Sequence, residues 1–214
     1  MNLIKKIKVF FDRIAPYKRR NKHFCIFNPE HKKHRASLRR RRGVAATEFA
    51  LTLPIWVSLL LGTVDSTYCI LVNEKTDRIA YSVTDIVTQY QNITIANLKD
   101  VLQATGQLMQ PFSFGNNGVV IVSSVYKPTG QPAVIEWQYS GGGTLSKASA
   151  IGTTGGTPTL PNGLVLNDND NVIISEVYYN FTPMFLNVGP LKANTIYRVA
   201  MYKPRLSPLI VPPT

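Results

Sequence analysis

The chain has 214 residues, of which 44% are hydrophobic and 17% charged, enough for one domain with a modest core and attached segments. The net charge of +12 is confined to the N-terminal tail, because residues 1–42 hold 15 Lys and Arg against 2 acids, whereas residues 43–214 hold 9 basic and 10 acidic residues. This asymmetry excludes a basic nucleic-acid-binding fold in the body of the chain, and the two cysteines, Cys25 and Cys69, exclude a fold that depends on a disulfide framework.

The basic tail has two parts. Residues 1–14 place apolar side chains at spacings near three and four, with lysines between them. This pattern is compatible with a helix lying on an anionic membrane surface and equally with a disordered tail whose periodicity arises by chance. Residues 15–42 are strongly basic and end in four arginines, a run that would by itself also suit a nucleic-acid patch.

An apolar stretch follows the arginines, with the sequence GVAATEFALTLPIWVSLLLGTVDSTYCILV from Gly43. Between Glu48 and Asp65 lie 16 uncharged residues, which correspond to about 24 Å of helix. Residues 44–72 correspond to about 43 Å, more than the roughly 30 Å of a hydrocarbon core. We therefore expect one transmembrane helix over residues 44–72. By the positive-inside rule the N-terminus is cytoplasmic and the C-terminal region lies outside the cytoplasm.

Pro54 lies in the middle of this span. Because proline removes a helical hydrogen bond and crowds the preceding turn, we expect a kink near residues 50–54. Helical periodicity resumes after the polar residues 73–78 and continues to about residue 91. A second helix is predicted from an N-cap at Thr94 to Pro111, with one apolar face formed by Leu98, Val101, Leu102, Leu108 and Met109. Residues 73–111 are therefore expected to form a periplasmic helical region.

The periodicity of the chain changes from helix to strand after residue 111. Four β-rich segments are predicted, and Pro128-Thr129-Gly130 makes the first two a hairpin; the segments are 119–126, 133–140, 172–181 and 195–202. Residues 141–170 are polar and glycine-rich, and they are too long for an ordinary connection, so we expect either a mobile surface loop or a contact surface. Residues 112–214 are thus predicted to be an antiparallel β domain, and the whole chain an α+β fold.

Gly43, Val44 and Glu48 together suggest proteolytic processing. A cut after Gly43 would free an α-amine at Val44, one helical turn from the Glu48 carboxylate. A carboxylate within a membrane helix is costly and marks a functional site by default, and in packed helices it could pair with the amine of a neighbouring subunit. The alternative is that Glu48 lies at the level of the headgroups and only marks the helix start. The glycine and the arginines before it favour the first interpretation.

Arg41-Arg42-Gly43, followed by VAATEFAL and then Leu53-Pro54, resembles the N-terminal signature of the TadE-like pseudopilins of tight-adherence (Flp-type, type IVb) pilus systems. The segments EVYY at 176–179, PMF at 183–185 and residues 198–205 also resemble the soluble part of that family. The resemblance implies a pilin-like fold in which a long transmembrane helix packs on a small antiparallel sheet. It also implies a leader, residues 1–43, that a prepilin peptidase removes between Gly43 and Val44, and assembly through Glu48 and the aromatic Phe49.

The domain beyond the helix is far larger than in the major Flp pilin, so the resemblance implies a minor pilin or pseudopilin that takes part in fimbrium biogenesis and cell adhesion. Its expected partners are the prepilin peptidase, other pilin subunits, an inner-membrane assembly platform and the membrane, with no nucleic acid. The expected location is the bacterial inner membrane, with a single pass, a cytoplasmic N-terminus and a periplasmic C-terminal domain, and incorporation into a surface pilus as a further destination.

Other classes of function are not favoured. The apolar stretch lacks the Ala-x-Ala cleavage site of a secretory signal. After Gly43 the chain has no histidine and one cysteine, and its carboxylates lack metal-ligand spacing, so we expect no enzyme, no cofactor and no metal. The DNDN sequence at 168–171 lacks the rest of a calcium loop and is expected to be a turn. Trp137, Tyr178 and Tyr179 are expected in the core. Two alternatives stay open: an uncleaved single-pass inner-membrane protein with a periplasmic binding domain, and a type II secretion-like pseudopilin.

Overall fold

The computed structural model describes residues 30–187, 189 and 192–214, with secondary structure alone for residues 30–43 and 162. The chain divides into two units, residues 1–53 and 54–214. Every described residue of the first unit belongs to helix α2 (Glu30–Val87), which continues through Pro54 without interruption. Residues 1–14, whose pattern is equally compatible with a membrane-surface helix and with a disordered tail, lie outside the described residues, and the kink expected at Pro54 stays a prediction.

Hydroxyl side chains in the apolar part of α2 donate hydrogen bonds to backbone carbonyls of the same helix. Ser58 Oγ donates to the Pro54 carbonyl at 2.8 Å, and Ser66 Oγ donates to the Gly62 carbonyl at 2.7 Å. Thr52 Oγ1 lies 3.2 Å from the Glu48 carbonyl. Because each hydroxyl finds an acceptor one turn back on its own helix, these side chains can occupy an apolar environment without an unpaired donor.

The second unit contains a four-stranded antiparallel sheet. Its order is β2-β1-β3-β4, with bounds Val134–Gly141, Gly118–Tyr126, Asn171–Phe181 and Asn194–Tyr202. All three neighbouring pairs are antiparallel, and β1 and β2 form the expected hairpin, with a register shift between Ser124 and Val125, where β2 contains one extra residue, Glu136. The four predicted strands are confirmed, as is the coarser prediction of an α+β fold with a long apolar N-terminal helix and a small antiparallel sheet.

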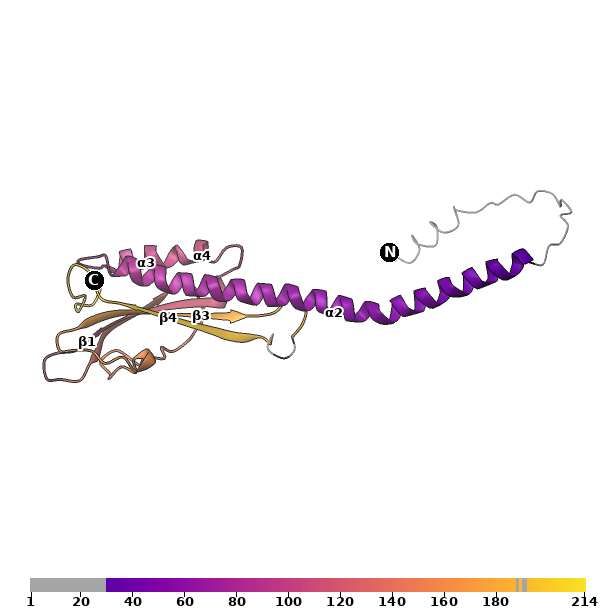
Figure 1. The fold of residues 1–214 in the computed structure, drawn as a ribbon. Coiled ribbons are helices and arrows are strands. Elements are labelled where there is room, and N and C mark those ends of the chain that lie inside the picture. The colour runs from indigo at the N-terminus through magenta and orange to yellow at the C-terminus, as the bar shows by residue number, and fades with distance from the viewer. Residues whose placement is uncertain (1–29, 188, 190–191) are drawn as a thin grey trace. The chain divides into compact units, whose positions relative to one another are not determined.

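One face of the sheet packs against the C-terminal part of α2 and against α3 (Ile95–Gln103), with α4 (Thr105–Leu108) following directly (Figure 1). Thr94 is the N-cap of α3, as predicted, and accepts a hydrogen bond from Asn97 N at 3.2 Å. The single helix predicted up to Pro111 is instead α3 followed by the short α4. The main core combines these elements, and its members include Val72, Ile79, Val83, Leu98, Leu102, Val120, Val122, Trp137, Ile173, Val177 and Phe181.

The other face of the sheet is covered by residues 141–170. Ile151 and Leu166 from this segment are buried together with Ile135, Val172 and other strand residues. The backbone of Ile135 also exchanges hydrogen bonds with this segment, accepting from Gly155 N at 2.8 Å and donating to Gly156 O at 3.1 Å. Because the helices cover only one face of the sheet, this segment packs on the apolar side chains of the other. The two interpretations of the segment, a mobile surface loop and a contact surface, stay predictions.

The C-terminal segment, residues 203–214, is built into the fold. The Leu209 carbonyl accepts from Ser124 Oγ at 2.6 Å and from Trp137 Nε1 at 2.9 Å. The carbonyl of Thr214, the last residue, accepts from Ile95 N at 3.2 Å, at the start of α3. This segment therefore joins the sheet to the helical region, which its proline-rich sequence did not indicate.

Candidate functional site

The predicted processing and assembly residues all lie in α2. Val44, Glu48 and Phe49 are exposed on the helix surface, and Gly43 lies in the same helix. Thr47 Oγ1 donates to the Val44 carbonyl at 2.8 Å. Because residues four apart on a helix lie on one face, Val44 and Glu48 are neighbours on that face. The structure therefore places Val44 and Glu48 on one face of α2, and the processing and assembly roles expected of these residues stay predictions.

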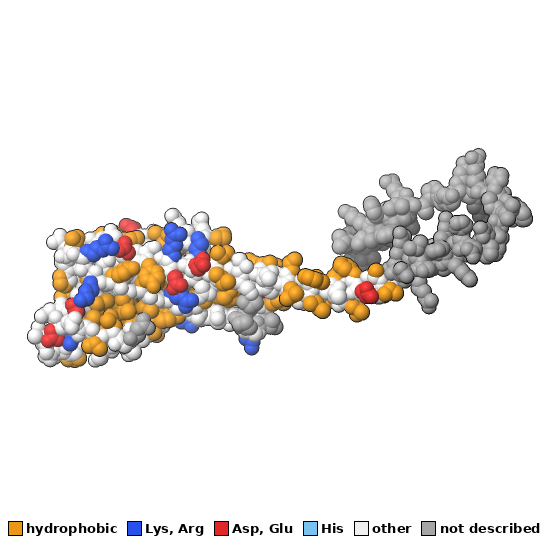
Figure 2. All heavy atoms as spheres, viewed as in Figure 1, with side chains coloured by type: hydrophobic (Ala, Val, Ile, Leu, Met, Phe, Trp, Pro, Cys, Tyr) orange, Lys and Arg blue, Asp and Glu red, His pale blue; other side chains and the backbone are white. Residues whose placement is uncertain are grey.

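One helix of the described chain, over residues 44–87, is long and apolar enough to span a membrane, and no side chain in its most apolar window is buried. Figure 2 shows apolar side chains along α2 where it extends beyond the sheet. Within the second unit the exposed apolar side chains before Asp65 are Ile55, Trp56, Val57, Leu59, Leu60 and Val64. An apolar surface of this extent indicates contact with lipid or with other helices.

Asp65 follows this exposed surface and is itself fully buried. Its Oδ1 accepts from Met184 N at 2.9 Å, and its Oδ2 accepts from Leu186 N at 2.6 Å. Phe185 N lies 3.1 Å from Oδ2 and 3.3 Å from Oδ1. Three consecutive backbone amides after β3 thus surround one carboxylate of α2, which compensates for the burial of its charge.

A second buried carboxylate, Glu176, lies in the middle of β3 and faces residues 141–170. It accepts hydrogen bonds from Ser149 Oγ, from Ala150 N at 2.8 Å and from the hydroxyls of Tyr178 and Tyr197 at 3.1 Å each. Burial, together with the charge of Glu176, raises the pKa of Tyr178 to about 12. Because donors from several elements converge on one carboxylate, we interpret Glu176 as the anchor of this covering segment.

Ion pairs attach α2 to β4 and to the C-terminal segment. Arg198 Nε lies 2.9 Å from Asp77 Oδ1, and the same guanidinium donates to Asn73 Oδ1 at 2.6 Å. Arg205 pairs with Asp85. These pairs are partly exposed, so each contributes modestly to stability and mainly fixes the position of α2 on the sheet.

The remaining sequence candidates have structural roles. Residues 168–171 form the expected turn, with Asn169 at φ 65°, and a hydrogen bond from Lys127 lowers the pKa of Asp168. Trp137, Tyr178 and Tyr179 are buried, as predicted. Among the residues that the structure describes, no cluster of three His, Cys, Asp or Glu side chains could hold a metal ion.

Sequence reasoning missed the roles of Asp65 and Glu176. Each is a carboxylate within a run of apolar residues, and that signal was available for both. In the sequence Asp65 only marks the end of the uncharged stretch. Its hydrogen-bond partners at 184–186 are about 120 residues away, and no local pattern connects them to it.

The fold and site define a class: an α+β domain whose sheet packs on a long apolar helix that can cross a membrane. Comparison of the chain with protein-family models, with curated proteins and with solved structures finds no match. A functional assignment therefore depends on the residues of α2 and on what surrounds them.

Proposed function

We propose that this protein is a minor pilin or pseudopilin, processed by a prepilin peptidase and used in the assembly of a tight-adherence type IV pilus. The observation that carries the proposal is the position of Gly43, Val44 and Glu48 at the start of the apolar part of α2, directly after four arginines of the same helix. Residues 39–48 therefore contain the four arginines that end the basic leader, the glycine that follows them and a carboxylate at the fifth position beyond that glycine.

Processing would create the group that the carboxylate needs. Cleavage after Gly43 releases the α-amine of Val44 on the same helix face as Glu48, which is exposed. In lipid an unpaired carboxylate is costly, whereas pairing with the amine of an adjacent subunit would remove that cost and set the axial offset between the two helices. Phe49 and the exposed apolar side chains that follow it would then pack between neighbouring helices.

The domain outside the membrane supports the same assignment. A helix that continues from the apolar span and packs on a four-stranded antiparallel sheet is the arrangement expected of a pilin-like fold. With the arginines on the cytoplasmic side, the sheet and its covering segment would lie in the periplasm, available to sister subunits.

N-terminal mapping of the protein purified from membranes tests the processing step. We expect a chain that begins at Val44 when a prepilin peptidase is present and at Met1 when it is absent. Gly43→Val should block the cut, whereas Gly62→Ala should not, because a Cβ at this second glycine of α2 would meet only Leu186 Cδ1 at 3.8 Å. A wild-type chain that still begins at Met1 beside an active peptidase would instead favour the uncleaved, single-pass protein with a periplasmic binding domain.

Assembly is tested separately with carboxylate variants. Glu48→Gln should be processed normally but be lost from filaments sheared from the cell surface, because the neutral amide cannot pair with the α-amine. Glu74→Gln is the matched control, since Glu74 is an exposed carboxylate on the same helix beyond the apolar span. Equal recovery of Glu48→Gln and Glu74→Gln in the sheared fraction would contradict the proposed role of Glu48 in assembly.

A further inference from the structure

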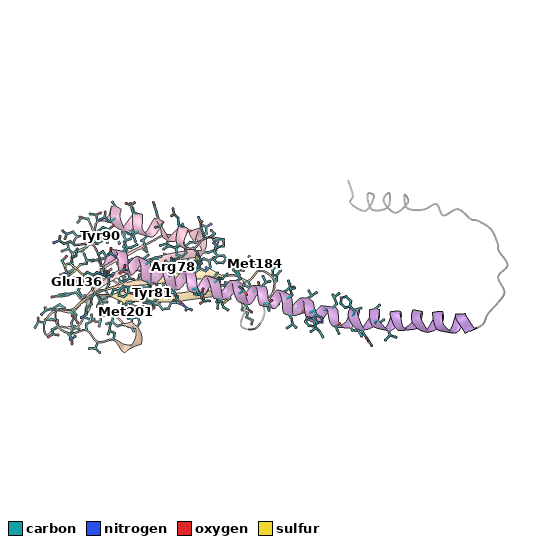
Figure 3. All side chains as sticks on the ribbon, turned by 45° about the horizontal axis from the view of Figure 1, so that its top comes forward. Arg78, Tyr81, Tyr90, Glu136, Met184 and Met201 are labelled. Carbon is teal, nitrogen blue, oxygen red and sulfur yellow. The ribbon has the colours of Figure 1, made fainter. Side chains whose placement is uncertain are left out.

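The segment that follows β3, Thr182–Asn187, presents apolar side chains at the end of the exposed apolar surface of α2. Thr182–Asn187 contains Met184 and Phe185, which are 63% and 57% exposed. Figure 3 shows Met184 beside α2 at the end of the sheet. Two large exposed apolar side chains in adjacent positions of one connection need an explanation here because they extend the exposed apolar surface of α2.

Asp65 fixes this segment at one position along α2. Its carboxylate binds the amides of residues 184–186, and Leu186 Cδ1 lies 3.8 Å from the position that a Cβ on Gly62 would occupy. Because the backbone polar groups face the helix, the side chains of Met184 and Phe185 are left exposed. The segment therefore lies beside the helix turn that contains Gly62 and Asp65.

The length of the helix places that turn at a membrane boundary. From Val44 to Val64, α2 contributes 21 residues before the buried Asp65, about 31 Å at 1.5 Å per residue, close to the roughly 30 Å of a hydrocarbon core. Ile70 and Leu71 are also exposed, but they lie about 9 Å further along the helix, which corresponds to the depth of the headgroups.

The chemistry of the segment suits the interface between lipid and water. Residues 182–187 contain no charged side chain, and no acidic residue occurs anywhere in residues 177–214. Aromatic and flexible apolar side chains are favoured where acyl chains meet headgroups, and the absence of negative charge avoids repulsion from anionic bacterial lipids.

From these observations we infer that Thr182–Asn187 is a second membrane contact, which inserts Met184 and Phe185 into the interfacial lipid beside the helix. This inference depends on the membrane anchorage contained in the proposed function. The contact would restrict tilting of the periplasmic domain about the end of the span, because the domain would be held at the bilayer by two points instead of one. Asp65 acts as the positioning residue that connects them.

Spin labelling in vesicles tests the inference. The full-length chain with Cys25→Ser and Cys69→Ser is reconstituted in phosphatidylethanolamine and phosphatidylglycerol, with a nitroxide attached at Met184→Cys or at Phe185→Cys. Collisions with oxygen, which partitions into lipid, are compared with collisions with a water-soluble nickel chelate. Leu59→Cys, on the apolar span, is the lipid reference, and Val165→Cys, an 81% exposed apolar position on the segment that covers the far face of the sheet, is the aqueous reference.

We expect the ratio of oxygen to nickel accessibility at 184 and 185 to lie nearer to that at 59 than to that at 165. If the ratio at 184 and 185 equals that at 165 while position 59 lies in lipid, the second membrane contact is refuted and the membrane-spanning helix is not. Low accessibility to both reagents would also overturn it, because the segment would then be packed against protein, such as a second copy of the chain. Nickel accessibility at position 59 itself would instead contradict the anchorage in the proposed function.

Discussion

Replacement of Asp65 by asparagine should detach residues 184–186 from α2 while preserving the volume of the side chain. The asparagine oxygen can still accept from Met184 N, which lies 2.9 Å from Oδ1 in the wild type. The amide nitrogen that replaces Oδ2 cannot accept from Leu186 N or Phe185 N, which lie 2.6 Å and 3.1 Å from that oxygen. Leu186 N therefore loses its acceptor and faces a donor instead, and Phe185 N keeps only its longer contact with Oδ1, at 3.3 Å.

The expected loss follows from one hydrogen bond to the carboxylate that is lost and one that is weakened. A hydrogen bond to a charged group contributes about 1.5–3 kcal/mol, and the freed amides can regain hydrogen bonds to water once the segment opens, so we expect a net loss of about 2–4 kcal/mol. That loss corresponds to a roughly 30- to 700-fold larger population of the open segment, at about 1.4 kcal/mol per factor of ten.

Hydrogen exchange measured by mass spectrometry on the full-length protein in detergent micelles reports this opening. Peptides that cover residues 184–187 should exchange faster by the factor above in Asp65→Asn, whereas those from β1 should change little. Asp77→Asn is the matched control, because Asp77 is a partly exposed carboxylate on the same helix that pairs with Arg198. If residues 184–187 of Asp65→Asn exchange within twofold of the wild-type rate, Asp65 is not the residue that holds this segment on α2.

Three further outcomes are expected in the second unit. The pKa of Tyr178 is about 12 in the folded chain against an ordinary value near 10, so absorbance at 295 nm should show a late-titrating tyrosine. The associated stability, measured by thermal melting, should be intact below pH 10 and fall as the pH rises toward 12. Glu176→Ala should release residues 149–151, lower stability by about 3 kcal/mol and expose this region to limited proteolysis; unchanged cleavage would contradict the anchor. Gly143→Ala should lower the melting temperature sharply, because its Cβ would collide with the Gly118 carbonyl. Gly106→Ala is the control and should not lower it, since nothing lies within 4 Å of a Cβ there. Equal melting temperatures of the two variants would refute the steric argument.

The strands and the helical region were predictable because their patterns are local. Alternation in residues 133–140 and the β-rich runs on either side predict strands, and a pairing of two strands through a short turn predicts a hairpin. The N-cap at Thr94 followed from the residue type and the apolar face after it. Each of these inferences uses residues within a few positions of one another, and each was confirmed.

The cover of the second sheet face was not predictable by the same means. Residues 141–170 are rich in glycine, threonine and serine, and their composition resembles that of an exposed loop. They pack on the sheet through two buried apolar side chains, Ile151 and Leu166, and through hydrogen bonds to Glu176. Both contacts connect residues far apart in the chain, so composition alone did not predict them.

The sequence alone determined the confinement of positive charge to the tail, the single apolar helix and the four-residue separation of Val44 and Glu48. These are properties of neighbouring residues, and the geometry of an α-helix converts such spacing into position on a face. Only the tertiary structure decided that Asp65 is buried by the amides of residues 184–186 and that Met184 and Phe185 lie next to it. The physical reason is that every residue except proline has a backbone N–H, so the sequence does not show which amides bind a given carboxylate. Packing alone brings those of residues 184–186 to Asp65, about 120 residues away.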